Sequence, residues 1–186
     1  MMPLSNKNAM VISVMLIVIC LWFLFAGPLR KESVYNQIEE AIHSLETDLN
    51  EVLHIHMDRA RTLVFFSTIQ SEVGVVTVEE AYGGFRVKEY IGKNQVALEN
   101  DLSWFGIESN SENIHMLYGV VNNPETSHIL LLSEENKAAT IIENNSLTVW
   151  YALMKDDLNS PITIRSFNKE GEKLYETGDP EYWSKQ

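Results

Sequence analysis

Residues 72–91 read EVGVVTVEEAYGGFRVKEYI, and this stretch decides the fold class of the chain. Two runs rich in β-branched and aromatic residues, 72–80 and 85–91, flank a Tyr-Gly-Gly sequence at 82–84. Glycine adopts positive φ in a tight turn without the steric penalty of a Cβ atom. The stretch therefore predicts a β-hairpin.

The same pattern of strands and turns continues on both sides of this hairpin. Upstream, EVLHIHM at 51–57 and TLVFFST at 62–68 flank a polar turn at 58–61 and predict a second hairpin. Downstream, we expect strands at 102–107, 114–121, 127–132, 138–143, 147–154, 162–167 and 172–176. Residues typical of turns separate them. The sequence thus predicts a mainly β domain over 51–177, an antiparallel β-sandwich or partly open barrel.

An uncharged segment precedes this domain. Residues 9–27, AMVISVMLIVICLWFLFAG, contain no charged side chain in 19 positions, and as a helix they would extend roughly 28 Å. We predict a transmembrane signal anchor here, after a short tail at 1–8. The pattern of apolar residues at 32–47 predicts a juxtamembrane amphipathic helix, which either packs on the domain or pairs with a second copy. Residues 178–186 form a C-terminal tail whose Tyr182 and Trp183 are candidates for docking on the domain.

The anchor is expected to be retained, with the domain outside the cytoplasm. Cleavage after Ala26 or Gly27 would place Leu24 or Phe25 where a signal peptidase needs a small residue. The bulky residues before Cys20 likewise argue against lipidation there. The count of Lys and Arg alone slightly favours the opposite orientation. The short tail and the absence of acidic residues from 1–31 decide our preference.

The charge of the chain excludes one large class of partner. Residues 1–31 hold three of the 14 basic residues and none of the 26 acidic ones. The rest therefore carries 11 basic and 26 acidic residues, a net charge of −15. Such a domain repels phosphate backbones, so we expect no nucleic-acid partner. The single cysteine lies in the anchor, so the domain has no disulfide and no cysteine metal site.

Two histidines are the weak candidates for metal ligands. Strand alternation places His54, His56 and Val52 on one face of 51–57, and Leu53, Ile55 and Met57 on the other. Two histidines supply half of a metal site. The other histidines, His43, His115 and His128, show no supporting spacing. We therefore predict no metal or other cofactor, and histidines that are half-buried or at the surface.

Three other features have simpler structural interpretations. The acidic sequence at 156–159 lacks the spacing and glycine of a calcium loop and is expected to be a solvated turn. The aromatic residues Trp104, Phe105, Trp150 and Tyr151 either line a groove or, as we prefer, fill the core. The glycosylation sequon at 144–146 is expected to be a turn. The sequence contains no Gly-x-Ser-x-Gly, no His-Glu-x-x-His, no phosphate loop and no dinucleotide fingerprint.

The order of these segments carries a resemblance. A helix is followed by VLHIHM, LVFFS, GVVTVEEAYGGFRV, LYGVVNNPE, AATIIE, LTVWYALM and PITIRSFNKEGEKLYE. This resembles a group of small, uncharacterised, membrane-anchored or exported proteins of Gram-positive, spore-forming bacteria, over residues 51–176. In relatives we expect a Gly-Trp-Lys-like turn where this chain has Gly84-Phe85-Arg86. The resemblance implies the placement and the fold, but no active site.

These observations leave three hypotheses for function. The leading one is a non-catalytic interaction or sensory module at the cell envelope, with the membrane and an envelope protein as partners. The second is an envelope hydrolase or metal-dependent enzyme in which His54 and His56 take part. The third is a purely structural envelope component.

Overall fold

The computed structural model describes residues 14–19, 21, 33–134, 136–179 and 181. The chain divides into two compact units, Met1–Gln37 and Ile38–Gln186. In the first unit, residues 14–19 and 21 are helical. The rest of the predicted anchor at 9–27 lies outside the described residues, as do Tyr182 and Trp183. Among the described residues, no helix has the length and apolar character needed to cross a bilayer.

The second unit is built from antiparallel strands, as predicted. The first sheet has the order β1 (Leu49–Met57), β2 (Thr62–Thr68), β3 (Glu72–Ala81) and β4 (Gly84–Gln95). The second has the order β5 (Phe105–Ser109), β6 (Ile114–Val121), β10 (Thr148–Met154) and β9 (Thr140–Glu143). The third has the order β12 (Lys173–Thr177), β11 (Ile164–Phe167), β7 (His128–Leu131) and β8 (Lys137–Ala138). A short 3-10 helix, η1 (Leu132–Glu134), follows β7.

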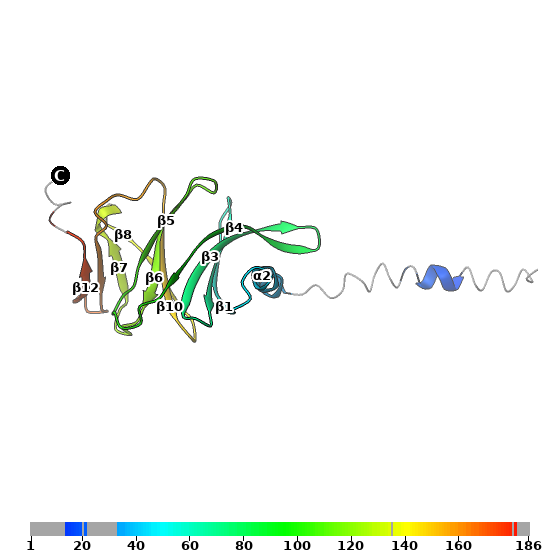
Figure 1. Ribbon diagram of the computed structural model, residues 1–186, viewed down its shortest axis with the longest axis horizontal. Coiled ribbons are helices and arrows are strands. Elements are labelled where there is room, and N and C mark those ends of the chain that lie inside the picture. The colour runs from blue at the N-terminus through cyan, green and yellow to red at the C-terminus, as the bar shows by residue number, and fades with distance from the viewer. Residues whose placement is uncertain (1–13, 20, 22–32, 135, 180, 182–186) are drawn as a thin grey trace, which may run out of the picture. The chain divides into compact units, whose positions relative to one another are not determined.

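The three sheets are stacked on one another (Figure 1). The second half of helix α2 (Val34–His43) packs against the first sheet. One core cluster joins the first and second sheets and includes Phe65, Met116 and Tyr118. Another joins the second and third sheets and includes Leu117 and Trp150. The second sheet is therefore apolar on both faces, which explains why all eight residues of β6 are buried. The predicted sandwich is confirmed, and the structure adds a third sheet.

Helix α2 packs on the outer face of the first sheet. Ser33 caps it, since its Oγ accepts a hydrogen bond from the Asn36 N–H at 3.2 Å. Ile38 and Ile42 are fully buried against β-strand residues such as Phe66 and Val76. Of the two alternatives for the predicted helix at 32–47, packing on the domain is the one observed.

Local departures from the predicted strands have identifiable causes. A register shift between Val52 and His54 interrupts the alternation of β1. Val52 thus joins Ile55 on the face toward α2, whereas Leu53 faces the second sheet. The predictions that Val52 shares a face with the two histidines, and that Leu53 shares one with Ile55, are both wrong because of this bulge.

Two predicted strands also end at different residues. The expected strand at 138–143 is divided between β8 in the third sheet and β9 in the second. The expected strand at 102–107 appears as β5, which begins at Phe105, preceded by an isolated bridge between Leu102 and Val121. At this bridge the backbone of Ser103 passes against Gly119 of β6.

We predict that Gly119→Ala destabilises the domain by about 1–3 kcal/mol. An added Cβ would lie 1.9 Å from the Ser103 carbonyl oxygen, which also accepts a 3.0 Å hydrogen bond from the Trp150 indole N–H. Either the backbone or this buried bond must shift. Urea unfolding of the full chain in mild detergent, followed by tryptophan fluorescence, measures the change.

Gly106→Ala, on the neighbouring strand β5, is the matched control. Its Cβ would meet only the flexible end of Leu158 at 3.2 Å and, somewhat further away, Leu117. Its effect should stay below about 1 kcal/mol. Equal losses of stability in the two variants would contradict the assignment of Gly119 as a close backbone crossing.

Candidate functional site

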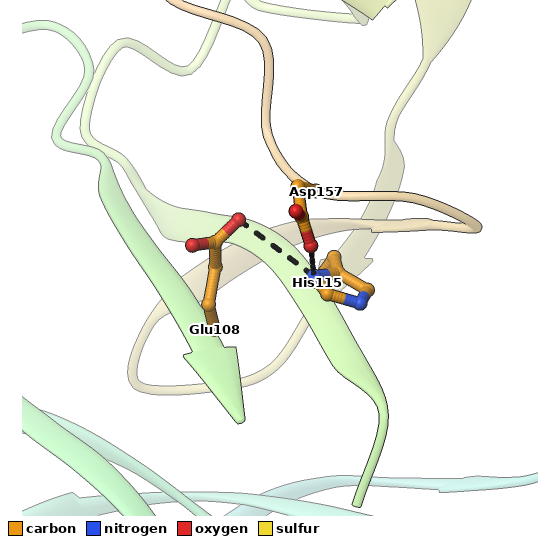
Figure 2. Close-up of side chains that lie close together, drawn as sticks. All are labelled: Glu108, His115 and Asp157. Carbon is orange, nitrogen blue, oxygen red and sulfur yellow. Dashed lines mark ion pairs between the residues drawn. The ribbon is translucent and has the colours of Figure 1, made fainter. Parts of the chain in front are cut away.

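A histidine and two carboxylates meet at one end of the second sheet (Figure 2). Glu108 on β5 and His115 on β6 are direct cross-strand partners. On the other side of β6, His115 pairs with Met154, the last residue of β10. Asp157 follows in the loop three residues later. The pairing of three strands thus brings together residues that are distant in the sequence.

The His115 ring nitrogen lies within ion-pair distance of both carboxylates but makes no hydrogen bond to either (Figure 2). His115 Nδ1 lies 3.3 Å from Asp157 Oδ1 and 3.6 Å from Glu108 Oε1. Neither contact has hydrogen-bond geometry, and Nδ1 is buried without a hydrogen-bond partner. The His115 side chain is 7% exposed, whereas that of Asp157 is 86% exposed. The cluster is therefore a buried ring nitrogen facing carboxylates that solvent can reach.

Three hydrogen bonds hold the loop that carries Asp157, two from backbone N–H groups and one from a side-chain amide. The Leu158 N–H donates to Glu108 Oε1 at 2.8 Å. The Asn159 N–H donates to Glu134 Oε1 at 2.9 Å, and the Asn159 side-chain amide donates to the other oxygen at 3.2 Å. The Leu158 side chain packs on the core between the second and third sheets. These contacts position Asp157 beside the histidine.

The predicted pair, His54 and His56, contacts a different group. Both rings approach the Tyr151 hydroxyl, at 3.4 Å from His54 Nε2 and 3.0 Å from His56 Nδ1. The His54 ring also stacks on Tyr151, with centroids 5.7 Å apart. A hydroxyl can donate to one imidazole and accept from the other, so a single tyrosine serves both. The histidines share a face, as predicted, and join the first sheet to the second.

The described residues contain one group of three His, Cys or acidic side chains whose ligand atoms all lie within 4.8 Å of one another, and it is Glu108, His115 and Asp157. It does not include His54 and His56. This group is not apparent in the sequence, because His115 has no neighbouring histidine at ligand spacing. One signal was present: a hairpin centred on residues 110–113 places Glu108 opposite His115.

The aromatic residues and the two predicted turns can also be located in the structure. Trp150 and Tyr151 are buried, and Trp104 and Phe105 pack partly buried against the two inter-sheet clusters, so the preferred core interpretation is confirmed. Residues 144–147 form the turn between β9 and β10, and 155–163 form the loop after β10.

Comparisons with protein families, curated proteins and solved structures found no match for this chain. The resemblance to membrane-anchored proteins of spore-forming bacteria stays a prediction.

We predict that lowering the pH weakens the domain through His54. Burial, and secondarily the charge of His56, lower the pKa of His54 below its usual value of 6.5. As the pH falls below 6.5, the unfolded chain binds this proton before the folded domain does. The free energy of unfolding therefore decreases in this range. His54→Gln should remove part of the decrease measured by urea unfolding at about pH 7 and about pH 5.

His128→Gln is the control for this experiment. His128 is exposed on β7 in the third sheet, away from Tyr151. Its substitution should leave the pH dependence of unfolding as in the parent chain. The explanation fails if the His54→Gln profile is as steep as that of the parent.

Proposed function

We propose that this chain is a single-pass membrane protein whose β domain lies outside the cytoplasm and acts as a binding or sensory module at the cell envelope. The observation that carries the proposal is the run of 19 uncharged residues at 9–27, directly before a domain of net charge −15. In lipid, a single apolar segment satisfies its backbone hydrogen bonds as a helix. In the sequence, six residues separate this segment from the start of α2 at Val34.

The β3–β4 hairpin supports a role in binding. In Figure 1 this hairpin reaches beyond the other strands of its sheet. Its two-residue loop holds Tyr82, which is fully exposed, and Gly83, whose φ is 95°. Tyrosine is enriched in protein interfaces because its ring supplies apolar contact area and its hydroxyl a polar contact. The β3–β4 hairpin, here named the hairpin arm, therefore presents an exposed aromatic side chain that is not part of the core of the domain.

The acidic domain narrows the class of partner. Its charge disfavours nucleic acids and anionic lipid surfaces. A partner protein with a neutral or basic surface is electrostatically compatible with it. We therefore propose an envelope protein as the partner of the hairpin arm.

Cysteine labelling of intact cells is the experiment that tests this placement. In a Cys20→Ala background, Tyr82→Cys supplies one fully exposed thiol on the domain, and Asn6→Cys supplies one on the N-terminal tail. We expect a membrane-impermeant maleimide to label Tyr82→Cys in intact cells, and Asn6→Cys only after permeabilisation. The reverse pattern would place the domain in the cytoplasm. Recovery of the labelled chain outside the membrane fraction would refute the anchor.

A photo-crosslinking amino acid at position 82 tests the binding role. We expect it to give a discrete adduct with another membrane or envelope protein in living cells, since this side chain is free to contact a partner. The same amino acid at Lys169, an exposed position beyond β11, is the control and should give no such adduct. Absence of an adduct at 82, or the same adduct at both positions, would contradict a role for the hairpin arm.

A further inference from the structure

We infer that Glu108, His115 and Asp157 form a binding site for a divalent first-row transition-metal ion. The site does not depend on where the domain lies, so its test is separate from the topology test. Two independent observations point to a ligand. One is the convergence of three ligand atoms within 4.8 Å. The other is the buried Nδ1 of His115, which faces both carboxylates but makes no hydrogen bond (Figure 2).

The buried ring nitrogen without a hydrogen bond is the stronger of these observations. A buried polar atom without a hydrogen bond costs about 1–3 kcal/mol, and a bound ligand at that atom offsets this cost. A metal ion between the nitrogen and the two carboxylates would accept its lone pair. It would also offset the mutual repulsion of the two carboxylates, which lie beside a single imidazole.

The spacing of the donor atoms fits a small ion. Ligands about 2.0–2.1 Å from a tetrahedral zinc ion lie roughly 3.3 Å apart. His115 Nδ1 lies 3.3 Å from Asp157 Oδ1 and 3.6 Å from Glu108 Oε1. An ion can therefore enter with only small movements of the two carboxylates, which are the more exposed members. Glu108 Oε1 also accepts the Leu158 N–H, an orienting hydrogen bond of the kind that supports metal-bound carboxylates.

The donor set selects the class of metal. Calcium and magnesium prefer oxygen ligands alone, whereas imidazole suits zinc and its first-row neighbours. Three protein ligands leave a coordination position on the exposed side, beside Asp157, for water or another ligand. The bound ion would tie the loop at 155–163 to β5 and β6.

Metal titration of the full chain tests the site. The chain is purified in mild detergent, treated with chelator and titrated with Zn²⁺ by calorimetry, and Co²⁺ absorption spectra report the ligands. We expect one Zn²⁺ per chain and a rise in the thermal unfolding midpoint on binding. Asp157→Asn should weaken binding by at least about tenfold. Because Asp157 is 86% exposed, this variant is expected to fold.

Asp156→Asn is the matched control, since this neighbouring acid is also exposed but is not a member of the cluster. It should bind Zn²⁺ as the parent chain does. The inference is overturned if the parent chain binds no stoichiometric Zn²⁺, or if Asp156→Asn and Asp157→Asn weaken binding equally. It is also overturned if only the double variant His54→Gln/His56→Gln loses the ion, which would assign it to that pair.

Discussion

Burial of the second sheet on both faces is the constraint from which the rest of the domain follows. Its central strand β6 has no exposed residue, and the opposite faces of β6 and β10 contribute to different core clusters. Such a sheet has no room for a polar side chain in its middle unless a partner satisfies it. Trp150 illustrates this rule, because its indole N–H reaches the Ser103 carbonyl across the close approach at Gly119. Polar chemistry in this layer is consequently displaced to the ends of the strands, and His115, the second residue of β6, stands at such an end.

The same constraint explains what could be predicted from the sequence. Strands β2 and β6 were predicted with their observed bounds, since a continuous apolar run between turns marks a doubly covered strand. The number of sheets was not predictable, because periodicity identifies strands but not which face of which strand meets which layer. Residue 139 is an example. The chain passes there from the third sheet to the second, although the sequence at 138–143 predicts a single strand. The bulge between Val52 and His54 likewise reverses the faces of Val52 and Leu53 without any signal from glycine or proline.

The candidate site could not be predicted for the same reason, since its residues meet only through the pairing of strands. The pair His54 and His56 is visible in the sequence, and the structure gives both rings a partner in the Tyr151 hydroxyl. His115 appears isolated in the sequence, yet its Nδ1 is the buried ring nitrogen that lacks a hydrogen bond. Half of its surroundings follow from a local hairpin, since Glu108 pairs with it directly. The other half comes from Asp157, whose position depends on the non-local pairing of β10 with β6. Spacing rules for metal ligands detect local pairs and miss such a combination.

The acidic composition of the domain also bears on the proposed metal site. A net charge of −15 after residue 31 lowers the electrostatic potential around the domain, which repels polyanions and concentrates small cations. Exposed carboxylates alone would hold such ions only loosely, because water and salt screen them. The buried Nδ1 of His115, on a strand that is covered on both faces, adds a directional ligand that exposed carboxylates alone do not provide. The net charge of the domain thus acts at long range and raises the local concentration of cations. The His115 nitrogen acts at short range and selects among these cations by ligand type.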